Sequence, residues 1–197
     1  LRFLNFVGFG FVDPIFKNDI SFYMFVLPFY KFAAGILFFL IAASITMVAV
    51  AYLLSGKTKK TVQEPKQALP GFDPGFSQIK ITVPKQGKNH LAFLAGFLLI
   101  ITAVFFYLKR YSILFSTQGA VYGAGFTDIT ITLPLYTILP IIAAVAAFIA
   151  FTYPYLQNTK LVVGSISFFV IILFAGTIIA GAVQLLYVQP NEFNIEE

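Results

Sequence analysis

Apolar residues occupy long blocks of this sequence, and polar and charged residues are confined to the intervals between them. Four windows contain no Asp, Glu, Lys, Arg or His; they are Phe32–Gly56, Leu91–Leu108, Ile129–Thr159 and Leu161–Gln189. Roughly 20 apolar residues in a helix cross the hydrocarbon core of a bilayer, which is about 30 Å thick. Each window therefore predicts one transmembrane helix.

Tyrosines near the ends of the windows support this interpretation, because tyrosine is enriched where a membrane protein meets the water interface. Tyr30 and Tyr52 flank the first window, Tyr107 ends the second, and Tyr187 lies near the end of the fourth.

The composition excludes a soluble protein. Hydrophobic residues make up 59% of the 197 residues and charged residues 11%, with a mean hydropathy of +0.88, whereas soluble domains are about 25% charged. The chain has no cysteine, which excludes disulfides, cysteine-ligated metals and a cysteine nucleophile. We predict an all-α integral membrane protein, a bundle of four transmembrane helices with interfacial segments and one short β-like stretch in the loop after the first helix.

The predicted organisation is a single membrane domain over residues 1–197. Its parts are an interfacial outer segment (1–29), helix 1 (30–54), a cytoplasmic insert (55–90), helix 2 (91–108), an outer segment (109–132), helix 3 (133–155), helix 4 (161–187) and the start of an outer tail (188–197).

Three local patterns refine this division. Gln78–Val83 alternates polar and apolar residues, which is typical of a strand. Thr127–Leu133 alternates similarly, but Pro134 makes it equally an approach to a helix. Pro140 lies deeper in the third window, and we expect it to kink or unwind that end, because proline cannot donate a backbone hydrogen bond.

Small residues recur at the spacing that brings helices together in lipid. The pairs are Ala92 and Gly96, Ala143 and Ala147, Ala146 and Ala150, Gly176 and Ala180, and Thr177 and Gly181. They predict packing within the bundle, with a dimer interface as the alternative.

Lysines set the predicted orientation. Most of them lie in the insert 55–90 and beside the turn before Leu161, and positive residues favour the cytoplasmic side. The segment before the first helix, the segment 109–132 and the tail are then outside. The net charge of +5 fits this topology and contact with anionic lipid, rather than nucleic acid.

Candidate chemistry is sparse. His90 is the only histidine, and we interpret it as an interfacial anchor, with a ligand or a base as the alternative. Gln184 is the polar residue hardest to place in a membrane, and we expect it to bond a neighbouring helix. The glycine-rich run Gly119–Gly125 lacks the Gly-Lys-Ser/Thr ending of a phosphate loop, so we expect a tight turn there.

Acidic residues gather on the predicted outer face. Asp128 is placed to cap the third helix. We interpret Asp13, Asp19, Asp128 and Glu192 as solvated turn residues, and a calcium site that they share with longer-chain partners is the alternative. We predict no catalytic, cofactor-binding or metal-binding residue, no cofactor and no enzymatic activity.

Two stretches carry a resemblance to a known family. They are Phe9–Tyr23, continuing to Leu27-Pro28-Phe29, and Arg110–Gly119, continuing through Gly123–Asp128 to Leu133-Pro134. Together with Gln189-Pro190-Asn191-Glu192 they resemble an uncharacterised prokaryotic family of large multi-pass membrane proteins. The resemblance implies about seven N-terminal membrane helices followed by a large extracytoplasmic domain, with this chain as the later membrane helices. It carries over no catalytic residue.

Two functions remain open on this evidence. The first is a membrane-embedded anchoring or scaffold part of an envelope protein, contained in the cell membrane with an extracytoplasmic tail. Its expected partners are membrane lipids, the remaining helices and extracytoplasmic domain of the same protein, and other membrane subunits, without nucleic acid. The alternative is a transport or channel-like path for a lipid or other apolar molecule, with Pro140, Gly176 and Gly181 as its flexible points.

Overall fold

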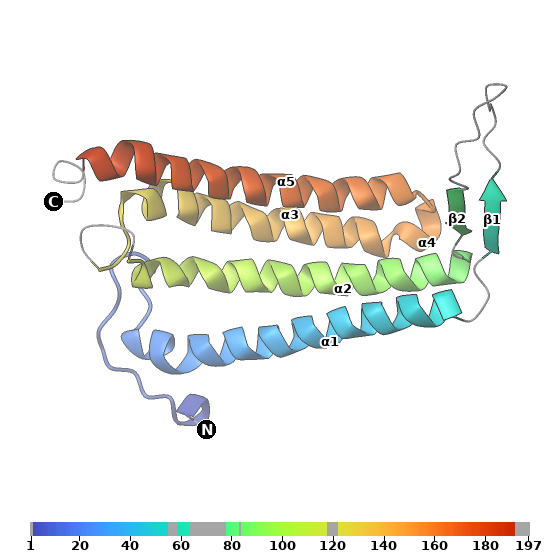
Figure 1. The fold of residues 1–197 in the computed structure, drawn as a ribbon. Helices are drawn as coiled ribbons and strands as arrows, with labels where there is room; N and C mark the ends of the chain where they lie inside the picture. The colour runs from blue at the N-terminus through green and yellow to red at the C-terminus, as the bar shows by residue number, and fades with distance from the viewer. Residues whose placement is uncertain (1, 55–58, 64–77, 83, 118–121, 192–197) are drawn as a thin grey trace.

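Four long helices lie side by side in the computed structural model, which describes residues 2–54, 59–63, 78–82, 84–117 and 122–191 (Figure 1). The α-helices are α1 (Leu27–Leu54), α2 (Lys85–Lys109), α3 (Leu133–Phe151), α4 (Tyr153–Leu156) and α5 (Thr159–Val183). The strands are β1 (Lys59–Gln63) and β2 (Gln78–Thr82). Shorter 3-10 or π-helical turns are η1 (Arg2–Asn5), η2 (Phe22–Val26), η3 (Arg110–Phe115), η4 (Asp128–Thr132), η5 (Gln184–Val188) and η6 (Gln189–Asn191).

These helices match the four charge-free windows. Together with their flanking turns they form four helical stretches, Phe22–Leu54, Lys85–Phe115, Asp128–Phe151 and Thr159–Asn191, that are long and apolar enough to cross a membrane. The prediction of four apolar helices is therefore confirmed.

The predicted bundle of four helices has the form of an open row. The main contacts follow chain order, because α1 packs against α2, α2 against α3, and α3 against α5 (Figure 1). The outer helices consequently leave large side chains uncovered, such as Phe39 of α1 and Phe174 of α5. Their faces are apolar all round, so hydrophobic periodicity could not show which faces meet.

The row has two distinct ends. At one end, here called the loop end, lie the segment before α1, the connection from α2 to α3, and the C-terminal end of α5 (Figure 1). At the other, the insert end, lie β1, β2 and the α4 turn. The helices therefore run alternately up and down.

Several helix boundaries differ from the expected ones. α2 begins at Lys85, directly after Pro84, rather than at residue 91. α1 begins at Leu27 and is preceded by the π-helical turn η2. α3 remains helical across Pro140, so the expected unwinding does not occur there. The helices extend beyond the hydrocarbon-spanning windows because a helix can continue into polar surroundings.

The insert contains a pair of strands where one short stretch was expected. β1 and β2 are antiparallel, with Lys59 opposite Thr82 and Gln63 opposite Gln78. β2 lies at the alternating positions noted in the sequence, whereas β1 carries no such signal. Residues 64–77 lie outside the described part of the chain.

Small residues form the centre of the packing between α2 and α3. Ala143, Ala146, Ala147 and Ala150 are all fully or almost fully buried. On the facing helix, a Cβ at Gly96 would lie only 2.6 Å from the ring of Phe151. Close backbone approach of this kind is the use that helices make of small residues in lipid.

Candidate functional site

The loop end holds most of the buried polar side chains described in the structure. Asp13 shapes the segment before α1 there. Its Oδ1 accepts hydrogen bonds from the backbone N–H groups of Ile15, at 2.9 Å, and Phe16, at 2.6 Å. Its Oδ2 accepts from the N–H of Asn18, at 2.9 Å, and from the hydroxyl of Tyr23, at 2.6 Å. The carboxylate of Asp13 thus stabilises a turn and connects it to η2 through Tyr23.

Asp19 organises the neighbouring part of the same segment. Its carboxylate accepts from the backbone N–H of Phe9, at 3.1 Å, and of Gly10, at 2.8 Å. It also accepts from the N–H and the hydroxyl of Ser21. Gly10 has a φ of +76°, a left-handed conformation that glycine adopts without strain.

Hydrogen bonding favours the ionised form of both carboxylates. The hydroxyl and the N–H of Ser21, followed by the N–H of Phe9, lower the pKa of Asp19 to about 2. Burial alone would raise the pKa of Asp13, but the hydrogen bonds from Tyr23 and three backbone N–H groups outweigh it and lower that pKa. Both groups are therefore charged at neutral pH.

An aromatic cluster fixes the segment to the ends of α1 and α2. The ring of Tyr111 lies 4.8 Å from that of Phe16 and 5.3 Å from that of Phe22, between ring centroids and with edge-on geometry. Tyr23, Leu27 and Tyr111 are buried in this cluster.

Two cations complete this corner. The guanidinium of Arg110 lies 3.9 Å above the ring of Tyr107 and donates to the hydroxyl of Tyr111 at 2.9 Å. The ammonium of Lys31 donates to Ser112 Oγ at 2.7 Å. This second bond joins α1 to η3, the turn that follows α2.

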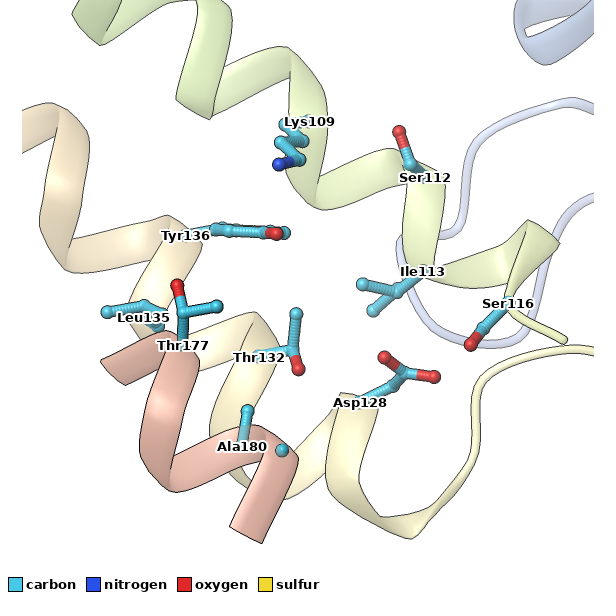
Figure 2. A pocket seen from close by; sticks show the side chains of 11 residues that line it. Lys109, Ser112, Ile113, Ser116, Asp128, Thr132, Leu135, Tyr136, Thr177 and Ala180 are labelled. Carbon is cyan, nitrogen blue, oxygen red and sulfur yellow. The ribbon is translucent and has the colours of Figure 1, made fainter. Parts of the chain in front are cut away.

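A cavity of about 310 Å³ opens beside η3, between the ends of α2, α3 and α5 (Figure 2). The residues lining it are Lys109, Ser112, Ile113, Ser116, Asp128, Thr132, Leu135, Tyr136, Thr177, Ala180 and Gly181. The lining thus combines one lysine, one aspartate and several hydroxyls with apolar side chains.

The two charged residues face the cavity from different sides (Figure 2). Lys109 Nζ lies 5.0 Å from the ring centroid of Tyr136, a cation–π distance. Asp128 is only 6% exposed, and within the described residues the one hydrogen bond to its carboxylate comes from the N–H of Gly125, at 3.4 Å. The cavity therefore holds a cation and a buried carboxylate that do not neutralise each other.

Asp128 performs only part of the expected capping role. Gly125 begins the helical segment, because its carbonyl accepts the N–H of Ile129. Asp128 reaches back to the N–H of Gly125, as the third residue of a capping box does. Among the described residues its side chain accepts no hydrogen bond from a later N–H group. Asp128 also lines the cavity.

The other predicted site residues are placed as follows. His90 is exposed in the second turn of α2, rather than in the insert. Gln184 is buried in η5. Within the described residues no three His, Asp or Glu side chains gather as metal ligands. Glu192 and residues 119–121 lie outside the described part of the chain.

The combination of Lys109 and Asp128 was not predicted from the sequence. Lys109 was considered among the charges that set the orientation, and Asp128 as a helix cap, a turn residue or a calcium ligand. One feature of the sequence could have indicated it. Lys109 and Asp128 lie near the two ends of the same predicted outer segment, 109–132, where that segment joins a helix.

Comparison with known proteins identifies relatives over the whole chain. The family model described as an uncharacterised protein family (UPF0182) matches residues 1–197. UPF0182 proteins of Methanospirillum hungatei and Clostridium perfringens are 35% and 29% identical, each over 100% of this chain, and one of Nostoc is 30% identical over 96% of it. The chain spans about a fifth of the length of these relatives (22%, 21% and 18%). No solved structure matches. The chain belongs to the uncharacterised protein family UPF0182.

Proposed function

We propose that residues 1–197 form the membrane-embedded anchoring and scaffold part of a larger multi-pass envelope protein, without catalytic activity of their own. The observation that carries this proposal is the apolar surface of the open row. Phe39 in α1, Phe148 in α3 and Phe174 in α5 are 70%, 69% and 62% exposed. Only lipid or other apolar helices can cover such a surface favourably.

The loop end supports the scaffold part of the proposal. Asp13 and Asp19 hold the segment before α1 in one conformation, and the cluster around Tyr111 fixes that segment to α1 and α2. A rigid corner of this kind would hold whatever adjoins it at a defined angle to the helices.

The proposal includes a location and an orientation in the membrane. The protein lies in the cell membrane, with the loop end extracytoplasmic and the insert end cytoplasmic, as the lysine distribution favours. Its partners are membrane lipids, the remaining helices and extracytoplasmic domain of the same protein, and other membrane subunits.

The test uses the whole protein in intact cells, with a recognition sequence for a specific protease inserted after Asn191. We expect protease added outside the cells to cleave there and to release the following part from the membrane. The control carries the same sequence between Pro84 and Lys85, at the insert end, and should be cleaved only after the cells are opened. Retention of the cleaved part on salt-washed membranes would contradict the anchoring role.

A transport path is the second candidate, and one observation favours it. Gly181 lines the cavity, and a Cβ there would meet no atom within 4 Å. Gly176, however, is covered by Leu135, which also lines the cavity. Leu135 therefore closes the seam between α3 and α5 at the inner end of the cavity, which supports a binding site more than a path.

A further inference from the structure

The cavity at the loop end combines charges of opposite sign with a lateral opening. We propose that it binds the headgroup of an aminophospholipid, with the phosphate against Lys109 and Ser112 and the primary ammonium against Asp128. This site requires no passage across the membrane, and it stands or falls independently of the anchoring role.

The phosphate side is provided by Lys109 and Ser112. No hydrogen bond or ion pair to Lys109 Nζ is formed by the described residues, whose contacts with it are aromatic rings. Ser112 Oγ accepts a hydrogen bond from Lys31, which leaves its own hydrogen free to be donated. One ammonium and one hydroxyl donor are thus available to an anion.

The ammonium side is provided by Asp128. Asp128 as a residue is only 6% exposed, and among the described residues its carboxylate has a single weak donor, the N–H of Gly125 at 3.4 Å. A buried carboxylate is costly unless it is paired with a cation or with several donors. A purely anionic ligand would be repelled by Asp128, so a zwitterion fits the lining better than phosphate alone.

A lipid fits better than a soluble zwitterion because the cavity opens toward the outer surface of α5. Thr177 and Gly181 line the cavity and are themselves exposed. On the same helix, Phe174 and Ile178 are 62% and 67% exposed. Acyl chains can lie along this apolar surface while the headgroup occupies the cavity.

The experiment measures binding to the purified, delipidated whole protein by native mass spectrometry. The probes are phosphatidylethanolamine, phosphatidylcholine and phosphatidylglycerol with the same acyl chains, and soluble phosphoethanolamine. We expect phosphatidylethanolamine to bind most tightly, because a trimethylammonium group cannot donate to Asp128 and a glycerol headgroup has no cation. Soluble phosphoethanolamine should bind much more weakly.

Two charge variants separate the two sides of the site. Lys109→Gln should weaken both phosphatidylethanolamine and phosphatidylglycerol by about tenfold, the effect of one charge-assisted hydrogen bond. Asp128→Asn should weaken phosphatidylethanolamine by about tenfold and should not weaken phosphatidylglycerol. Lys85→Gln, at an exposed lysine of the insert end, is the control and should change neither.

A steric variant tests the cavity without altering its charge. Gly181→Leu should fill the opening and abolish phosphatidylethanolamine binding without lowering thermal stability. Gly164→Leu is the matched control, because a Cβ there also meets nothing within 4 Å on the same helix, and it should bind normally.

Three results would overturn the proposal. One is equal binding of the three lipids, and another is an Asp128→Asn variant that binds phosphatidylethanolamine as the parent does. The third is binding of soluble phosphoethanolamine as tight as that of the lipid, which would exclude the lipid as the source of the headgroup.

Discussion

At the scale of single residues, the carboxylates of Asp13 and Asp19 stabilise the loop end through hydrogen bonds rather than ion pairs. Their partners are backbone N–H groups and the hydroxyls of Tyr23 and Ser21. Hydrogen bonds to an ionised acceptor are stronger than those to a neutral one. The shape of the segment therefore depends on both carboxylates being charged.

This dependence predicts loosening of the segment at low pH. The pKa of Asp19 falls from 3.8 to about 2 in the folded protein. A lowered pKa contributes stability that is present above 3.8 and is lost as the pH falls through about 2. We expect the amides of Phe9 and Gly10 to lose protection from hydrogen exchange in that range, after correction for intrinsic exchange rates.

Asp19→Asn is the control for this prediction. The amide cannot ionise, so protection of the same two amides should be lower at neutral pH and should no longer change through the acid range. An unchanged pH dependence in the variant would assign the transition to another group.

Residue roles of this kind were only partly predictable. The sequence indicated turn residues at Asp13, Asp19 and Asp128, with a calcium site as the alternative. The first two accept hydrogen bonds from backbone N–H groups of their own loop, as turn residues do. Which N–H groups they bind could not be predicted, because the sequence of side chains does not specify the path of the loop. Asp128 was placed near the start of a helix correctly, whereas its position opposite Lys109 depends on how three helices converge.

At the scale of elements, the contact between α2 and α3 depends on side-chain size. The spacing of Gly96 with Ala92, and of Ala143 with Ala147, predicted helix contacts, and all four residues are buried. Phe151 fills the space above Gly96, and its ring is held between Phe93 and Phe97 at 5.3 Å from each, centroid to centroid.

Gly96→Ala should therefore destabilise the whole protein in detergent. The added methyl would lie 2.6 Å from the ring of Phe151, which packs edge-on against Phe93 and Phe97, and overpacking costs about 1–3 kcal/mol. We expect a lower midpoint of thermal unfolding, partly restored by Phe151→Leu. Gly35→Ala, where a Cβ meets nothing within 4 Å, should leave the midpoint unchanged, and equal effects of the two alanines would contradict this account.

The ends of the elements were the least predictable feature at this scale. Charge-free windows mark the part of a helix that lipid surrounds, whereas backbone hydrogen bonding continues until proline or a turn stops it. α2 accordingly includes Lys85, Lys88 and His90 before its apolar part. The π-helical turns η2 and η4 have no sequence signature that distinguishes them from α-helix.

At the scale of the whole molecule, the number of helices and their order along the chain could be predicted from the sequence. The way in which the helices pack against one another could not. Uncharged helices have no polar stripe to mark the outward face, so a closed bundle and an open row have the same pattern. Both edges of the row are almost uncovered, because none of the most apolar 18-residue window of α1 and only 6% of that of α5 is buried.

We expect the two edges to differ in the full-length protein. A photoreactive residue at Phe39 of α1 should crosslink to other segments of the same polypeptide, because the anchoring proposal packs its remaining helices against this row and the proposed lipid chains lie along α5 rather than α1. The same residue at Phe174 of α5 should crosslink to lipid. Peptide mapping of the products distinguishes these cases, and exclusive lipid crosslinks from Phe39 would contradict the expectation.

The carboxylate bonds of the loop end also bear on how the protein is made. Within the described part of the chain, the hydrogen bonds accepted by Asp13 and Asp19 come from residues no more than 10 positions away, and short-range contacts form faster than long-range ones. Synthesis proceeds from the N-terminus, so this segment can take its final shape before α2 leaves the ribosome. Tyr111 and Ser112 would then pack against a segment that is already folded. The last step in forming this corner would be the docking of the end of α2.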